Sequence, residues 1–188
     1  YDKLPYDPDT DFAPISLLCS SPHLLAAHPS VPASNVKELI ALVRASPPGK
    51  FSFASAGRGT PAHLAGELFK SLAGVKMVHV PYKGGAPMLV DLIGGQIDFA
   101  FDNLPSSIQH IRSGKVKALA VTTSKRWPYA PDIPTMAESG LAGYESSAWF
   151  GLFAPGNTPK GIVDLLNKQV SAILKISEVE KNYLEQGA

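Results

Sequence analysis

The chain has 188 residues, of which 45% are hydrophobic and 18% are charged, and its formal net charge is +1. This length and composition suffice for a buried core in one large domain or two small ones, and they exclude a disordered chain. The charges are mixed in sign and form neither a basic stripe nor a block of like charge. We therefore expect no nucleic-acid partner and no anionic membrane surface as a partner.

The single cysteine, Cys19, excludes an intrachain disulfide and a multi-thiolate metal site, and it leaves the cellular compartment open. No apolar run reaches the ~20 residues that a membrane helix needs. The chain begins with the turn-rich stretch YDKLPYDPDTDFAP, which has neither an initiator methionine nor the pattern of a leader. We interpret this start as the middle of a longer protein.

Apolar residues at helical spacing predict a helix over residues 36–43, capped by Ser34 and stopped by Pro47-Pro48-Gly49. The stretch FSFAS that follows predicts a strand. The next helix is expected to bury Leu64, Leu68 and Leu72 and to end at Gly74, before a strand over KMVHVPY.

The same alternation continues with a helix over GAPMLVDLIGGQ, a strand over IDFAFDN, a helix over PSSIQHIRSGK and a strand over VKALAVTT. Strands that alternate with helices of about ten residues predict a mostly parallel sheet with helices on both faces, because a parallel pair requires a crossover. No repeat of the solenoid kind is present.

Residues 124–147 are rich in Pro, Gly and Ser, and they predict a connection with at most one short helix, around Thr135 to Ser139. A strand over AWFGLFAP follows, and then a helix opened by Thr158-Pro159. The apolar face expected for that helix consists of Ile162, Leu166, Val170 and Ile173. SEVEKNYLEQG predicts a last, short helix.

The early strands PISLLCSS and PHLLAAHP are expected to pair with AWFGLFAP rather than with the central strands. Chain ends that meet around a middle module predict two lobes, with the second inserted into the first. The predicted division is residues 1–29 for part of the first lobe, 30–143 for the second lobe and 144–188 for the return to the first. Hinges are expected near residues 28–32 and 142–148.

Ligands of an open parallel sheet gather outside the carboxyl ends of its strands. Three polar loops follow predicted strands here, at residues 55–60, 82–85 and 102–107. In the first of them, Thr60 and Pro61 predict a helix start, while Gly57 and Gly59 allow backbone N–H groups to face outward. The positive end of the helix dipole adds to these donors, so the turn is suited to an anion.

GRGTPA matches the dinucleotide pattern G-x-G-x-x-A, but the acidic residue expected about 20 positions further on is replaced by Tyr82-Lys83. The Walker pattern and the G-x-S-x-G pattern are absent, and the five histidines have no metal-ligand spacing. These absences disfavour a hydrolase, a nucleotide triphosphatase and a metal site, and no cofactor is predicted. An enzyme that binds a phosphate-bearing or dinucleotide ligand at Ser55 to Thr60, with His63 as its acid or base, remains the alternative.

Several stretches resemble the periplasmic solute receptors of tripartite tricarboxylate transporters, also called Bug receptors, and the resemblance covers essentially the whole chain. The stretches are SFASAGRGTPAHLAGELF, MVHVPYKGGAPMLVDLIGGQIDFAFDNLPS, VKALAVTTSKR, DIPTMAESGLAGYE and WFGLFAPGNTPKGIVDLLN. The resemblance implies an α/β protein with the periplasmic-binding-protein type II, or Venus flytrap, architecture. It further implies a periplasmic receptor without catalytic activity, which closes on a small organic carboxylate and delivers it to a membrane permease.

Amino-acid, dicarboxylic, tricarboxylic and aromatic acids are the ligands that the resemblance implies, held largely by backbone groups and ordered waters. The implied ligand-binding residues are Ser55, Ala56, Gly57, Gly59, Thr60, His63, Asp102 and Asn103. Among them, Asp102 is awkward beside a carboxylate and is better suited to capping its helix or fixing a water. Outside this set, His79 is expected in the core, and Arg58 on the solvated surface.

Members of that family begin with a strand, a Pro-Gly-Gly turn and a helix that supply the first lobe's half of the clamp, and they continue beyond the position of Ala188. We therefore expect a fragment with one complete α/β lobe and a partial second lobe. A homodimer in which the remnants, including Trp149 and Phe150, cover each other's exposed sheet is an open alternative.

Overall fold

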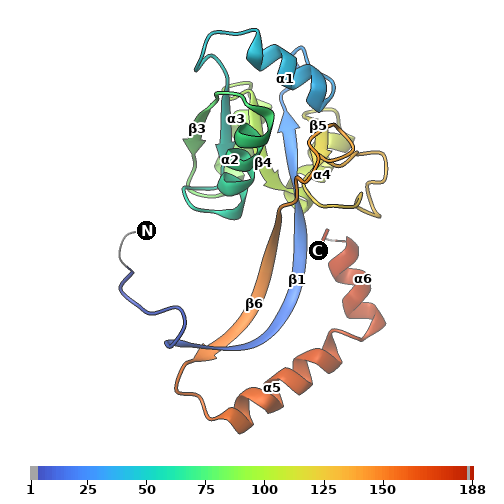
Figure 1. Ribbon diagram of the computed structural model, residues 1–188. Helices are drawn as coiled ribbons and strands as arrows, with labels where there is room; N and C mark the ends of the chain where they lie inside the picture. Colours follow the sequence, from blue (N-terminus) through green and yellow to red (C-terminus); the bar gives the residue numbers. More distant parts are fainter. Residues whose placement is uncertain (1–3, 186) are drawn as a thin grey trace. The chain divides into compact units, whose positions relative to one another are not determined.

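A computed structural model describes residues 4–185 and 187–188 of the chain. Its elements, shown in Figure 1, run in the order β1 (Phe12–Ala27), α1 (Val36–Arg44), β2 (Ser52–Ser55), α2 (Pro61–Ala73), β3 (Val78–Pro81), α3 (Gly85–Ile93), β4 (Phe99–Asn103), α4 (Leu104–Arg112), β5 (Lys117–Val121), β6 (Ser147–Pro155), α5 (Lys160–Ile173) and α6 (Ser177–Glu185). Strands and helices alternate from α1 to β5, as the sequence predicts.

The chain forms two compact units, each described here by itself. The central unit holds Ser21–Ala148 and Gly187, and the terminal unit holds the described residues 4–20, 149–185 and 188. The sequence predicts boundaries at residues 29/30 and 143/144 between two lobes that close on a ligand. These lobe boundaries stay a prediction.

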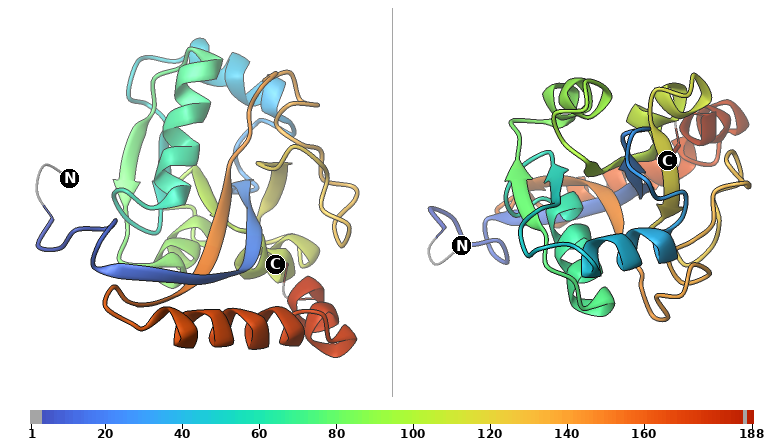
Figure 2. Two further views of the ribbon diagram at one scale, coloured as in Figure 1. Left: turned by 60° about the horizontal axis from the view of Figure 1, so that its bottom comes forward. Right: turned by 90° about the horizontal axis from the view of Figure 1, so that it is seen from above.

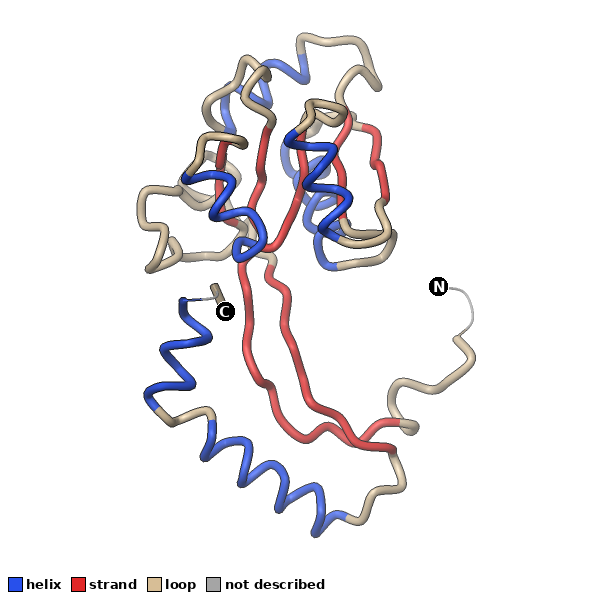
Figure 3. Tube along the Cα trace, turned by 180° about the vertical axis from the view of Figure 1, so that it is seen from behind, coloured by secondary structure: helices blue, strands red, loops and turns tan. Residues whose placement is uncertain are grey.

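The sheet has the strand order β3-β2-β4-β1-β5, with β6 beside β1 and off this path. β2 is parallel to both β3 and β4, whereas β1 lies antiparallel between β4 and β5. Four of the five strands on the path therefore share one direction. Figure 3 shows the strands as red tubes, with β1 and β6 side by side.

The prediction for the early strands is wrong in one respect. PISLLCSS and PHLLAAHP belong to one long strand, β1. The end of this strand pairs with the central strands β4 and β5. β1 also pairs with the late strand β6. The physical reason is the apolar run Leu24–Ala27, whose four residues are all fully buried. A strand that is apolar on both faces requires an interior position in a sheet covered on both sides.

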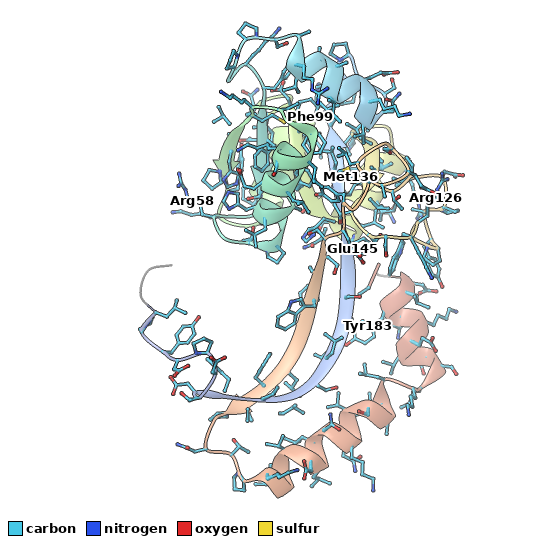
Figure 4. All side chains as sticks on the ribbon, viewed as in Figure 1. Arg58, Phe99, Arg126, Met136, Glu145 and Tyr183 are labelled. Carbon is cyan, nitrogen blue, oxygen red and sulfur yellow. The ribbon has the colours of Figure 1, made fainter. Side chains whose placement is uncertain are left out.

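Alternate residues of the central strands face two different core clusters. Leu25, Phe53 and Phe101 pack on one side with α1 and α2, and Leu24 and Ala54 pack on the other side with α3 and α4. Phe99 belongs to the first cluster, which also buries Met136 from the later connection (Figure 4). The period of two along the strands thus builds a layer of helices on each face of the sheet.

The cap of α1 is Asn35 and not Ser34. The Asn35 side chain accepts a hydrogen bond from the Glu38 N–H at 2.9 Å, and the Glu38 carboxylate in turn accepts from the Ser34 N–H at 2.7 Å. The arrangement resembles a capping box, except that the acidic side chain accepts from the residue before the cap rather than from the cap itself.

The predicted buried face of α2 is also wrong. Leu64 is 60% exposed and Leu72 is 45% exposed, and the helix instead buries Ala62, Ala65, Gly66, Phe69 and Ala73. A Cβ atom added at Gly66 would overlap the ring of Phe53, so small residues allow α2 to lie directly on the sheet. The predicted end of the helix is confirmed, since Gly74 caps it in the left-handed conformation with φ of 61°.

Residues 124–147 contain no helix in the described structure, in keeping with the prediction of a connection with at most one short helix. Thr135 instead forms a turn in which its hydroxyl accepts from the Glu138 N–H at 3.0 Å and its own N–H donates to the Glu138 carboxylate at 2.8 Å. Arg126, labelled in Figure 4, forms an ion pair with Glu138 at 2.9 Å. The connection is therefore a packed part of the central unit.

The terminal unit presents apolar side chains that its own residues do not cover. On α5, Ile162 is 50% exposed and Leu165 is 56% exposed, and on β6, Trp149 is 61% exposed. Figure 2 shows α5 and α6 as successive red helices. The helix cap lies at Pro159, so Thr158 is not the capping residue that the sequence suggests, because the chain enters helical geometry one residue later.

Within the described part of the chain, every helix is too short or too polar to cross a membrane.

Candidate functional site

The turns that follow β2, β3 and β4 meet at one edge of the sheet. The Tyr82 N–H donates to the Ser55 carbonyl at 3.0 Å, and the Gly84 N–H donates to the Ala56 carbonyl at 3.0 Å. A Cβ atom on Gly85 would lie 3.3 Å from Asp102 Oδ1. The three polar loops singled out in the sequence are thus neighbours, as expected for the carboxyl ends of parallel strands.

The turn from Ser55 to Thr60 is held by its own hydroxyl groups. The Gly57 carbonyl accepts from Ser55 Oγ at 3.0 Å and from Thr60 Oγ1 at 2.8 Å. Gly59 has a φ of 75°, a conformation that favours glycine. Thr60 caps α2 by accepting from the His63 N–H at 3.3 Å, and proline follows at the first helical position. The predicted helix start is confirmed.

Some N–H groups of the turn are used internally and others are not. The Gly57 N–H donates to Ser55 Oγ at 3.3 Å, and the Gly59 N–H donates to His63 Nδ1 at 3.0 Å. The N–H groups of Ala56 and Ala62 have no hydrogen-bond acceptor among residues 4–185 and 187–188. These two groups are therefore available to an external acceptor.

The helices α3 and α4 begin without a side-chain cap. Gly84 precedes α3 and Asn103 precedes α4, and neither makes a capping hydrogen bond through its side chain. Backbone N–H groups at helix starts carry partial positive charge, and a ligand can satisfy them in place of a cap. Three helix N-termini gathered at one sheet edge make an environment suited to a negatively charged group.

His63 and His79 lie against the same turn. Their rings stack with centroids 3.8 Å apart and planes inclined by 14°. His79 Nε2 lies 2.7 Å from Ser55 Oγ, and its ring also stacks on Phe53 at 4.9 Å. His79 is half-buried beside the turn rather than in the core, so the sequence interpretation of this residue is wrong. Its position on a strand beside the glycine-bearing turn is the signal that was missed.

The charge state of His79 follows from its surroundings. Burial, followed by the nearby His63, lowers the pKa of His79 to about 4. The imidazole is therefore neutral at physiological pH, and one of its ring nitrogens donates while the other accepts.

Asp102 lies beneath the site rather than on its surface. Only 2% of the residue is exposed, and its Oδ2 accepts from Ser107 Oγ at 2.8 Å. Burial raises the pKa of Asp102 to about 6. Asn103, not Asp102, occupies the cap position of α4.

His23 of β1 is a residue that the sequence did not single out. It stands opposite Asn103 in the antiparallel register and is 2% exposed. Its Nδ1 and the Asn103 Oδ1 are both buried without a hydrogen-bond partner in the described part of the chain. Burial lowers the pKa of His23 to about 4. A histidine directly before the apolar run Leu24–Ala27 was the available signal.

The structure thus brings the predicted site residues into two adjoining groups. Ser55, Ala56, Gly57, Gly59, Thr60 and His63 form the turn and the start of α2, and Asp102 and Asn103 end the neighbouring strand β4. Their roles as ligand contacts stay predictions. Among the described residues, no three His, Cys, Asp or Glu side chains are grouped so that they could hold a metal ion.

A mixed α/β unit with helix N-termini at one sheet edge is typical of solute-binding proteins with the periplasmic-binding-protein type II fold. Comparison with known proteins identifies the family. Residues 1–187 match the tripartite tricarboxylate transporter family receptor, and the chain belongs to this family. The family consists of solute receptors rather than enzymes, so the enzyme alternative is set aside.

Individual relatives agree with this placement. The chain is 37% identical to Protein BugT of Bordetella pertussis, covering 99% of this chain and 57% of that protein. It is 41% identical to R. palustris Rpa4515, solved with adipate, with a TM-score of 0.94 over 100% of this chain and 62% of that one. MatC from Rhodopseudomonas palustris, solved with bound malate, is 38% identical, with a TM-score of 0.88 over 98% of this chain and 63% of that one.

The chain spans about half the length of the curated relatives that it matches.

Proposed function

We propose that this chain supplies one side of the binding site of an extracytoplasmic receptor for a small organic carboxylate. The receptor works in the periplasm and hands its ligand to the membrane permease of a tripartite tricarboxylate-type transporter. The binding-site residues proposed for this side are Ser55, Ala56, Gly57, Gly59, Thr60, His63, Asp102 and Asn103, of which Asp102 supports the site from beneath.

One observation carries the proposal: the starts of α2, α3 and α4 meet at one edge of the sheet, and two of these helices lack a side-chain cap. A carboxylate placed there accepts hydrogen bonds from backbone N–H groups, such as those of Ala56 and Ala62, that have no acceptor within the described chain. Two relatives solved with adipate and with malate support a carboxylate as the ligand class.

The proposed mechanism follows from the chemistry of the turn. Closure of the receptor removes water from the carboxylate and so strengthens each of its hydrogen bonds. The permease then recognises the closed form, because a ligand shifts an open-closed equilibrium only through its higher affinity for the closed state.

The proposal is tested by ligand-induced stabilisation of the full-length receptor. Thermal unfolding is measured with a panel of mono-, di- and tricarboxylates, and with nucleotides as the contrasting class. A ligand at 100 times its dissociation constant adds about 2.7 kcal/mol to the stability, a shift of several degrees. Stabilisation by a carboxylate supports the proposal, and stabilisation by nucleotides alone overturns it.

A matched pair of glycine variants locates the site. Gly59→Ala and Gly74→Ala each place a side chain on a residue with positive φ, at 75° and 61°, so both carry a similar backbone cost. Only Gly59 lies in the proposed binding turn. Loss of carboxylate affinity in Gly59→Ala and its retention in Gly74→Ala is the expected result.

We further propose that the isolated 188-residue chain self-associates through the apolar face of its terminal unit. The open groove there has a volume of about 360 Å³ and is lined in part by Ile15, Leu17, Trp149 and Phe153. Exposed apolar surface of this kind favours association in water.

A further inference from the structure

The Ser55 hydroxyl lies among three polar neighbours but has only one proton to give. Its Oγ is 3.0 Å from the Gly57 carbonyl oxygen, 2.7 Å from His79 Nε2 and 3.3 Å from the Gly57 nitrogen. The carbonyl oxygen accepts hydrogen bonds and cannot donate. All three contacts are satisfied together when the Ser55 proton is donated to the Gly57 carbonyl and His79 Nε2 carries the proton of the bond to Ser55.

We propose that His79 is a positioning residue of the binding turn, where its Nε2–H donates to Ser55 Oγ and thereby directs the Ser55 proton onto the Gly57 carbonyl. This inference rests on the proposed function and names the residue that holds its site in shape. His79 lies on β3, outside the turn that it orders.

His63 holds the other end of the binding turn. Its Nδ1 accepts from the Gly59 N–H at 3.0 Å, and its ring stacks on His79 at 3.8 Å. The two imidazoles therefore fix the turn at both of its ends, through Ser55 and through Gly59. Phe53 stacks on the His79 ring at 4.9 Å and lies 6.5 Å from the His63 ring, so the three rings pack together.

The surroundings of His79 keep its ring neutral. Its charged neighbours are Glu67 and Lys70 of α2 and Arg58 of the turn, with His63 stacked on its face. The two cations and the low exposure oppose a proton on His79 more than the single carboxylate favours it, which agrees with its lowered pKa.

The consequence concerns which N–H groups remain for the ligand. With Gly57 and Gly59 held internally, the N–H groups of Ala56 and Ala62 are the donors left without an acceptor in the described chain. Without the His79 donor, the Ser55 hydroxyl can rotate and donate to acceptors other than the Gly57 carbonyl. The Gly57 carbonyl then loses one of its two hydroxyl donors. The turn then samples other conformations before binding, which lowers affinity.

The test uses the full-length receptor and isothermal titration with adipate, malate and the carboxylate that gives the largest thermal shift. His79→Phe keeps a flat ring in the stack but has no donor. His79→Gln places an amide N–H near the position of Nε2. Tyr129→Phe removes a polar group from an aromatic ring at an exposed position outside the turn and serves as the control.

We expect His79→Phe to weaken binding by about tenfold, which corresponds to the cost of about one disordered hydrogen bond. His79→Gln should recover part of this loss, and Tyr129→Phe should bind like the wild type. In a Ser55→Ala background, His79→Phe should cause little additional loss, because the two residues act through one hydrogen bond. A purely structural role of the ring predicts equal losses in both backgrounds.

Nuclear magnetic resonance of the ring nitrogens tests the inference without relying on a variant that folds. The wild-type receptor should show a neutral His79 with the proton on Nε2 at pH 7. A proton on Nδ1, or unchanged affinity of a folded His79→Phe, overturns the inference while the proposed function stands. If the wild type binds no carboxylate, the proposed function fails first and the inference with it.

Discussion

The phenol of Tyr144 donates a hydrogen bond of 2.7 Å to the Ala65 carbonyl of α2, across 79 positions of sequence. Tyr144 is 1% exposed and belongs to the same core cluster as Phe53 and Phe69. This bond fastens the irregular residues 124–147 to the helix that begins at the candidate binding turn. The connection therefore contributes to the rigidity of α2.

Replacement of Tyr144 by Phe should remove this bond and keep the packing of the ring. We expect a loss of about 1 kcal/mol in the free energy of unfolding, the usual net worth of one hydrogen bond. Urea denaturation of the variant measures the loss. Tyr129→Phe is the control, because Tyr129 is 46% exposed and should tolerate the change without cost. Equal effects of the two variants would contradict the assignment.

Gly66 is the point of closest approach between α2 and the sheet. A Cβ atom there would overlap the Phe53 ring, so Gly66→Ala should force the helix or the ring to move. Overpacking of this kind costs about 1–3 kcal/mol, and it should lower the thermal midpoint by several degrees.

The matched control for Gly66 lies on α5. A Cβ atom added at Gly161 would meet nothing within 4 Å. Because alanine is the better helix former, Gly161→Ala should be neutral or stabilising by up to about 1 kcal/mol. If Gly66→Ala were also stabilising, the close contact between α2 and Phe53 would not exist in solution.

Much of this fold could be predicted because it follows from short-range pattern. The alternation of strands and helices from α1 to β5, the end of α2 at Gly74 and the helix start at Thr60 all follow from local chemistry. The neighbouring positions of the three polar loops followed from the parallel order of the strands.

The errors have a common physical origin in long-range contacts. The buried face of α2 is made of small residues because it must approach Phe53, and hydrophobic spacing cannot detect a face built from alanine and glycine. The pairing of β1 with β4 and β5 joins residues far apart in sequence. For the site, His79 was missed because its role depends on the neighbouring strand, where it meets Ser55.

The proposed self-association of the terminal unit can be tested at the exposed apolar residues of α5. Replacement of Ile162 and Leu165 by glutamate should shift the 188-residue chain toward the monomer, because charges placed in an apolar contact must lose water on association. Gln169→Glu adds one negative charge at an exposed polar position of the same helix and should have little effect. Sedimentation velocity measures all three proteins. A wild-type chain that remains monomeric at high concentration would contradict the proposal.

The buried carboxyl of Asp102 should make stability depend on pH in a defined direction. Its pKa is about 6 in the folded chain, raised by burial above the unfolded value of about 3.9. Between these values the folded state binds more protons than the unfolded state, so stability falls as pH rises from about 4 to about 6. At pH 7 the accumulated penalty is about 3 kcal/mol.

Asp102→Asn should remove that penalty, because the amide oxygen still accepts from Ser107 and carries no charge. The variant should therefore be more stable than the wild type at pH 7, and the difference should shrink as pH falls toward 4. His23 and His79 have pKa values lowered to about 4, so both cost stability as pH falls below 6.5. Since both histidines are present in the two proteins, their effect cancels in the difference.

Ser107→Ala provides the opposite test of the same carboxyl. The Ser107 hydroxyl lowers the pKa of Asp102 through its hydrogen bond, so its removal should raise that pKa further and extend the loss of stability to higher pH. Urea denaturation at a series of pH values follows all three proteins. A stability difference between Asp102→Asn and wild type that stays constant from pH 4 to pH 7 would mean that folding does not shift the pKa of Asp102. The carboxyl would then have to be hydrated in solution, and the burial described for Asp102 would be wrong.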